Sequence, residues 1–156
     1  MAALAAFPAF TVSCDWPTSA HSSKVIINEV NCHGRDWVEI VNVTTSAMDL
    51  GGWYVADKMG DSAHRYALPS GTQIQPGEHL VVRQEMYPEE GFPFGLKCSD
   101  EEVDTVYLLD NEQAIVDRVT LSNVPYGITW GRLPDLTGLW RDTAPTEGEP
   151  NEAPAS

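Results

Sequence analysis

Basic residues are scarce in this chain of 156 residues, which has 9 lysines and arginines against 23 aspartates and glutamates and a formal net charge of −14. Affinity for a nucleic-acid backbone depends on basic side chains that release counterions, so we expect no nucleic-acid partner. Anionic membrane surfaces are disfavoured for the same reason. A basic protein surface or a bound cation suits the charge better.

Long hydrophobic runs and helical periodicity are also lacking. No stretch of 18 apolar residues occurs, so the sequence predicts no membrane span. No segment keeps apolar residues at positions i, i+3, i+4 and i+7 over three turns, so we expect no long helix. With 42% hydrophobic residues the chain can still bury one sizeable core, and a single domain is the default expectation.

Cysteine is sparse and odd in number, with Cys14, Cys32 and Cys98 only. In an oxidising compartment we expect Cys32 and Cys98 to pair, because both lie in polar connections of the folded region; in a reducing compartment all three are thiols. Cys32, His33, Cys98 and His64 also supply the atoms of a zinc site. The close C-x₂₋₄-C spacing typical of such sites is missing, which favours a disulfide or buried thiols.

What the chain does contain is a series of short segments rich in Val, Ile, Tyr, Trp and Thr, separated by turn residues. These segments are predicted strands: 24–31, 36–43, 52–57, 63–68, 78–84, 103–110, 114–120 and 126–132. The loop from Asp110 to Gln113 closes a hairpin between two of them. Many short strands with Gly and Pro between them predict a β-sandwich.

The two ends of the chain differ from this body. Residues 1–23 are apolar and rich in alanine, with small residues near Ala20, which is typical of a secretory signal, but no basic residue precedes the apolar run and Pro8 interrupts it. The alternative is an N-terminal arm that packs on a neighbouring subunit, with Phe7 and Phe10 as contact residues. We therefore expect an arm or signal-like segment at 1–23, a domain at 24–151 and a disordered tail at 152–156.

Two glutamates, Glu29 and Glu39, lie inside the first two predicted strands, and hairpin pairing of these strands would set their carboxylates side by side. Such a pair repels unless a cation, a proton or an arginine is shared. With Asp36 they form a candidate metal site, but calcium prefers six to eight oxygen ligands. We therefore favour a salt-bridged strand pair, with Arg35 as the nearest arginine in the sequence.

Alternation along these two strands assigns side chains to faces. It predicts that Glu29 shares a face with Val25 and Ile27. In the second strand it places Trp37 beside Glu39, opposite the apolar side chains. Most tryptophans of a sandwich this small pack in its core or rim, and Trp37 is the one we expect to contact a partner.

The sequence shows no catalytic constellation. The G-x-S-x-G motif of a nucleophile elbow is absent. A glycosidase would need two opposed carboxylates in a cleft, which a flat sandwich face does not offer. We therefore expect neither an enzyme nor a cofactor. Asn42-Val43-Thr44 matches an N-glycosylation acceptor, which matters only in a eukaryotic secretory route.

A set of short motifs, in a fixed order from Val25 to Asn151, resembles a lamin tail domain. The motifs are "VIINEV", "DWVEIVN", "DLGGWYVAD", "LPSGTQIQPGEHLVV", "FGL", "VYLLD", "IVDRV", "GITWGRLPD" and "APTEGEPN". The resemblance implies an all-β, immunoglobulin-like β-sandwich, with Trp53 as a structural residue at its edge. The segment "KCSDEEVD" departs from the family, since it is more acidic and carries Cys98.

The residues of the motifs "INEV" and "DLGGWYVAD" are closer to those of bacterial and algal extracellular members than to those of nuclear lamins. This likeness implies an extracellular or organelle-lumen location rather than the cytoplasm or nucleus. It also implies a non-catalytic module that binds protein partners, as an accessory subunit of a larger assembly. The alternative is a secreted or lumenal adhesion or carbohydrate-binding module that supports an enzyme in trans.

Overall fold

The computed structural model describes residues 24–87 and 89–155, which fold into short β-strands and one 3₁₀ turn, η1, at Ser62–His64. The strands are β1 Val25–Asn31, β2 Trp37–Asn42, β3 Met48–Asp49, β4 Tyr54–Ala56, β5 Arg65–Ala67, β6 Gln73–Ile74, β7 His79–Arg83, β8 Asp104–Leu109, β9 Ile115–Leu121, β10 Thr129–Leu133 and β11 Leu139–Thr143. No helix of these described residues is long and apolar enough to cross a membrane.

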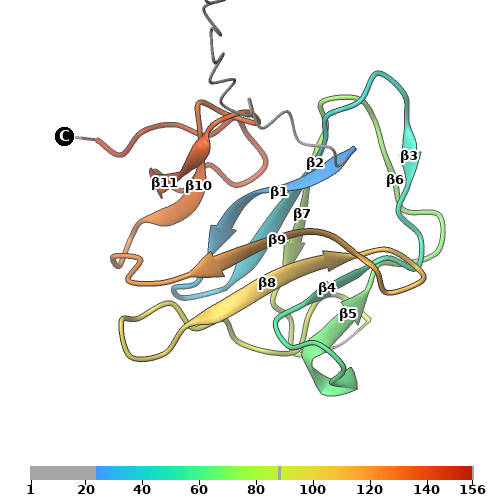
Figure 1. The fold of residues 1–156 in the computed structure, drawn as a ribbon, viewed down its shortest axis with the longest axis horizontal. Helices are drawn as coiled ribbons and strands as arrows, with labels where there is room; N and C mark the ends of the chain where they lie inside the picture. Colours follow the sequence, from blue (N-terminus) through green and yellow to red (C-terminus); the bar gives the residue numbers. More distant parts are fainter. Residues whose placement is uncertain (1–23, 88, 156) are drawn as a thin grey trace, which may run out of the picture.

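The strands form two principal antiparallel sheets that pack face to face (Figure 1). One sheet has five strands in the order β11-β10-β1-β2-β7, and the other has four in the order β5-β4-β8-β9, while β3 and β6 form a small separate ladder. Buried Val, Ile, Leu and Phe side chains from both sheets fill the space between them. The predicted all-β, immunoglobulin-like sandwich is confirmed.

Each of the eight predicted strand segments overlaps an observed strand, and the β8–β9 hairpin closes through Asp110–Gln113. The sequence missed β3, β6 and β11. Strands β3 and β6 have two residues each, which is too few to show alternation. Most residues of β11 are exposed, so the strand lacks the apolar pattern from which a strand is predicted.

A bulge at Asn28 changes the faces of β1. Ile27 pairs with Ile40 and Glu29 pairs with Glu39, so this step covers two residues along β1 but only one residue along β2. Val25 and Ile27 point into the core before the bulge, and Val30 does so after it. The prediction that Glu29 shares a face with Val25 and Ile27 is therefore wrong, because one extra residue reverses the alternation.

The bulge turns Glu29 to the outer face of the five-stranded sheet, where Glu39 also lies. Residues 144–152, which we call the C-terminal segment, follow β11 and return over this outer face, reaching Glu29 on β1 and Glu39 on β2. The ion pair between Glu147 and Arg83 extends the contact to β7. The sandwich thus has a third, irregular layer over one sheet.

Candidate functional site

Glu29 and Glu39 lie opposite one another and are fully buried beneath the C-terminal segment. Glu29 accepts hydrogen bonds from the backbone N–H of Thr146 at 3.2 Å, from the hydroxyl of Thr146 at 2.7 Å, and from the hydroxyl of Thr129. Burial raises the pKa of Glu29 above its ordinary value, while these hydrogen bonds favour the charged form and oppose the shift.

Glu39 is held from three directions. Its Oε1 accepts a hydrogen bond from Asn28 Nδ2 at 2.9 Å and lies 2.9 Å from His79 Nδ1. Its Oε2 accepts from the backbone N–H of Gly148, also at 2.9 Å. The oxygens of both carboxylates thus accept hydrogen bonds from groups of the domain itself. These bonds hold the C-terminal segment against the outer face of the five-stranded sheet.

The predicted salt bridge between this pair and an arginine is wrong. Arg35 lies in the exposed turn after β1 and pairs instead with Glu85. Hydroxyl, amide and backbone N–H donors satisfy Glu29 and Glu39 without the cost of burying a guanidinium.

Asp36 does not join the two glutamates in a metal site. Its Oδ2 accepts a hydrogen bond from the backbone N–H of Leu96 at 2.7 Å, and burial raises its pKa. Between residues 24 and 155, residue 88 aside, the single group of three metal-ligating side chains with neighbouring ligand atoms is Cys32, His33 and Cys98. The glutamates and Asp36 form no such group.

Asn151 is the main anchor of the C-terminal segment. Its Nδ2 donates to the carbonyls of Asn28 at 3.0 Å and Arg132 at 3.1 Å, and its backbone N–H donates to Asp135 at 3.1 Å. A Cβ at Gly131 would lie 2.9 Å from Asn151 Nδ2, so glycine is required for this close approach. In the sequence, only the motif "APTEGEPN" pointed to this segment.

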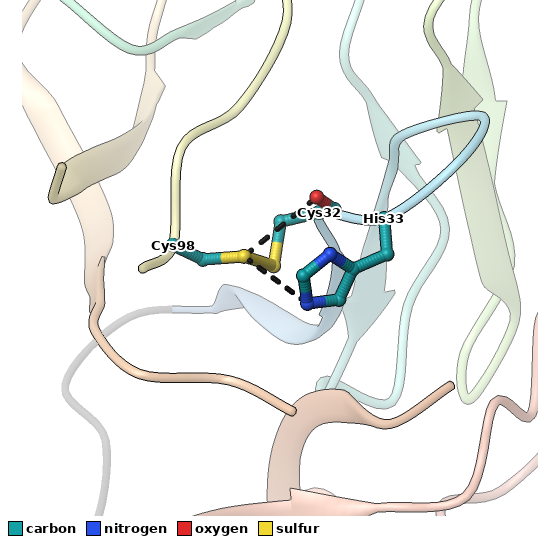
Figure 2. A group of neighbouring side chains, drawn as sticks. All are labelled: Cys32, His33 and Cys98. Atoms are coloured by element: carbon teal, nitrogen blue, oxygen red, sulfur yellow. Dashed lines mark hydrogen bonds between the residues drawn. A yellow bond between two sulfur atoms is a disulfide. The ribbon is translucent and has the colours of Figure 1, made fainter. Parts of the chain in front are cut away.

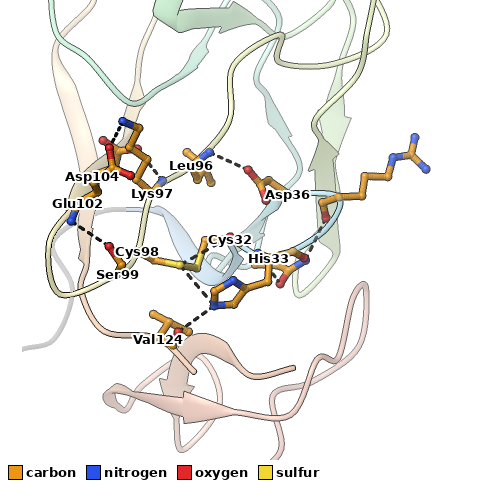
Figure 3. Close-up of a disulfide and its surroundings, with 12 residues drawn as sticks. Cys32, His33, Asp36, Leu96, Lys97, Cys98, Ser99, Glu102, Asp104 and Val124 are labelled. Atoms are coloured by element: carbon orange, nitrogen blue, oxygen red, sulfur yellow. Dashed lines mark hydrogen bonds and ion pairs between the residues drawn. A yellow bond between two sulfur atoms is a disulfide. The ribbon is translucent and has the colours of Figure 1, made fainter. Parts of the chain in front are cut away.

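At one end of the sandwich, Cys32 and Cys98 are joined by a disulfide with a Cα–Cα distance of 6.2 Å (Figures 2 and 3). The turn after β1 carries Cys32, and the acidic loop before β8 carries Cys98. His33 lies against this bond, with Nε2 at 3.6 Å from Cys98 Sγ and 2.8 Å from the carbonyl of Val124. The exposed ring of Tyr126 packs on His33, with ring centroids 5.5 Å apart.

His64, the fourth residue of the zinc site considered from the sequence, does not belong to this group. Its Nδ1 lies 2.9 Å from Asp57 Oδ1, and its ring stacks on Phe94 at a centroid distance of 5.8 Å. Burial raises the pKa of Asp57, and the bond to His64 opposes that shift. A four-residue site built from Cys32, Cys98 and both histidines is therefore wrong.

The other predicted contact and modification residues are buried or lie outside the described residues. Trp37 is 5% exposed, so its indole offers almost no surface to a partner. Asn42 is fully buried, and its Nδ2, the atom that would carry a glycan, donates to the carbonyls of Ser46 and Ile74. Phe7 and Phe10 lie outside the described residues.

Sequence reasoning missed a pocket of about 260 Å³ between the edges of the two sheets. Its walls come from β5 and the turn after it, from β7, and from the loop after β7: Tyr66, Leu68, Pro69, Thr72, Leu80, Val81, Val82, Arg83, Glu85 and Glu90. Next to it in the chain, Met86 and Tyr87 are 85% and 57% exposed. The pocket lining is therefore mostly apolar, with two acids, Glu85 and Glu90, and one base, Arg83.

Strand β7 is the edge of the five-stranded sheet, and part of that edge is open. Gln84 donates to the Asp36 carbonyl on the β2 side, whereas the Arg83 carbonyl accepts from Phe92 on the opposite side. Backbone groups alternate along an antiparallel strand, so the N–H and C=O of Val81 point away from β2. The run of three apolar residues in "HLVVR" gives no sign in the sequence that this strand lies at an edge.

The family model described as Lamin Tail Domain matches residues 18–123, more than half of the chain. The match ends before β10, so β10, β11 and the C-terminal segment lie beyond it. No curated protein matches the chain.

Proposed function

The chain belongs to the lamin tail domain family, a family of immunoglobulin-like and generally non-catalytic domains, and from this premise we propose that it is a protein-binding module of a larger assembly. The observation that carries the proposal is the pocket beside the open edge of β7. The bacterial and algal extracellular members remain the proposed nearest type.

The partner we propose is an extended, basic segment of another protein. Unpaired strand edges bind extended chains through backbone hydrogen bonds, and neighbouring pockets select their side chains. Val81 supplies the backbone groups, and the pocket accepts one apolar side chain. Glu90 in the pocket lining, with a net charge of −14 on the whole chain, favours lysine and arginine in the partner. The charges of Glu85 and Arg83, which also line the pocket, are already paired with Arg35 and Glu147.

Selection of random peptides on the full chain tests this proposal. We expect enrichment of peptides that combine basic residues with an apolar residue, and binding that weakens as salt is added. Val81→Pro removes an N–H that β2 does not use, so the sheet stays intact while affinity falls at least about tenfold. Val81→Thr is the matched control, because it keeps the N–H and should bind like the wild type.

Two results would contradict the proposal. Equal binding by the wild type and Val81→Pro would remove the β7 edge as the site. Failure to select any basic peptide would remove the proposed partner class. Thermal unfolding of both variants shows whether the fold is retained.

The proposal that the domain is non-catalytic rests on the two carboxylates a hydrolase could use. Both are buried and hydrogen-bonded to the C-terminal segment. A panel of hydrolase substrates tests it, with Glu29→Gln as the variant. Turnover that Glu29→Gln abolishes would establish an enzyme.

A second candidate is a secreted or lumenal adhesion or carbohydrate-binding module, and the Cys32–Cys98 disulfide favours the oxidising compartment that it implies. We propose that location for either function. Titration of glycans against tryptophan fluorescence separates the two functions. A saturable change would favour carbohydrate, and none is expected if the partner is a protein.

A further inference from the structure

The disulfide end of the sandwich holds three soft metal ligands in one place. One ligand atom each from Cys32, His33 and Cys98 lies within 4.8 Å of the other two (Figure 2). Two thiolates and an imidazole are the donors that zinc prefers. In the structure the two sulfurs are bonded to each other, so any such site exists only after reduction.

We propose that reduction of the Cys32–Cys98 disulfide turns this group into a Zn²⁺ site with three protein ligands and one open position. The domain then has two alternative forms of the same cross-link. One is a covalent bond in an oxidising compartment, and the other is a metal bridge wherever a dithiol reductant is present.

The distances fit a tetrahedral ion. With Zn–S near 2.3 Å and Zn–N near 2.0–2.1 Å, a sulfur and a nitrogen ligand lie about 3.6 Å apart. His33 Nε2 already lies 3.6 Å from Cys98 Sγ. The two sulfurs must move from their bonded distance to about 3.8 Å, which rotation about the Cα–Cβ bonds supplies.

The backbone holds both cysteines in position without the disulfide. Cys32 directly follows β1 and is 6% exposed, and Cys98 is 4% exposed. Cys98 pairs with Val103 in an isolated bridge, and its carbonyl accepts a hydrogen bond from Val124 at 2.9 Å. These contacts keep the two Cα atoms at their separation of 6.2 Å, so the ligands remain neighbours after reduction.

The reaction balances as two steps. A dithiol gives two electrons and two protons to the Cys32–Cys98 bond, which becomes two thiols while the dithiol becomes a disulfide. Zn²⁺ then replaces the two thiol protons, which pass to solvent. His33 must bind through a deprotonated Nε2, and it gives up its contact with the Val124 carbonyl.

Acidic side chains lie near this end of the sandwich. His33 and Asp104 both act electrostatically on Asp36. Glu102 lies in the same acidic loop as Cys98, where it pairs with Lys97 (Figure 3). Tyr126, whose ring packs on His33, is 86% exposed, so the site lies close to the surface.

The test uses the full chain with Cys14→Ser, so that no third thiol competes. The protein is reduced with a phosphine, its thiols are counted, and Co²⁺ and Zn²⁺ are titrated without oxygen. We expect one ion per chain, thiolate-to-cobalt absorption of a tetrahedral site, and displacement of Co²⁺ by Zn²⁺. Before reduction, the same protein should bind neither ion.

Variants separate the three-ligand site from a simple dithiol. His33→Ala should weaken Zn²⁺ binding by more than about tenfold and change the cobalt spectrum, and Cys32→Ser should abolish the site. His64→Ala is the matched control and should bind like the parent. Equal affinity of parent and His33→Ala, or no binding by a reduced chain that circular dichroism shows to be folded, would overturn the proposal.

Discussion

A buried glutamate is costly unless its oxygens are satisfied, and Glu29 shows how this domain meets that requirement. Thr129 on β10 and Thr146 in the C-terminal segment donate to it. Its pKa is still raised, because desolvation outweighs these hydrogen bonds. Glu29 is thus a group that the folded state protonates more readily than the unfolded chain.

This shift sets the direction of a pH dependence. Between the ordinary pKa of 4.5 and the higher pKa in the folded state, the folded state binds more protons, so stability falls as pH rises through that window. Glu29→Gln should flatten this part of the stability profile. Urea unfolding between mildly acidic and neutral pH measures it, with the exposed Glu112→Gln as control. Profiles of equal slope for wild type and Glu29→Gln would contradict the assignment.

At the scale of elements, hydrogen bonds from polar side chains hold the C-terminal segment on the five-stranded sheet. Asn151→Ala removes the two hydrogen bonds that Nδ2 donates to the carbonyls of Asn28 and Arg132. We expect a loss of about 1–3 kcal/mol in the free energy of unfolding.

Chemical denaturation measures this loss, and Glu149→Ala, an exposed change in the same segment, is the control. The slope of the denaturation curve should stay unchanged if only the anchor is lost. An Asn151→Ala protein as stable as the Glu149→Ala control would show that the segment does not depend on this anchor.

The sequence predicted the strands well, because half-buried strands such as Asp104–Leu109 carry an alternation that short-range patterns reveal. It failed at Asn28, since a bulge is a single residue whose effect shows only in the pairing with β2. It also failed to name the partners of Glu29 and Glu39. Those partners are 100 or more residues away for Thr129 and Gly148, a separation that no local pattern spans.

For the whole molecule, the Cys32–Cys98 disulfide joins two loops separated by 66 residues. Closing a loop of this length lowers the entropy of the unfolded chain, and the chain-entropy estimate of its contribution is about 4 kcal/mol. Cys32→Ser with Cys98→Ser should therefore lower the free energy of unfolding by roughly that amount, within the usual range of about 2–5 kcal/mol.

Mass mapping under non-reducing conditions, on protein from its native compartment, checks the bond itself. Cys14→Ser serves as the control and should leave stability unchanged. Free thiols at both Cys32 and Cys98 in that compartment would remove the disulfide and, with it, the proposed extracellular or lumenal location.

Because the C-terminal segment covers Glu29, it also sets the order in which parts of the domain fold during synthesis. The ribosome makes β1 well before Thr146, which donates to Glu29 and follows it by 117 residues. Until the C-terminal segment emerges, the outer face of β1 and β2 carries two acids without their final donors. The domain therefore completes its fold only after Thr146 has left the ribosome, and a nascent chain stalled before Thr146 should be digested by protease faster than the finished domain.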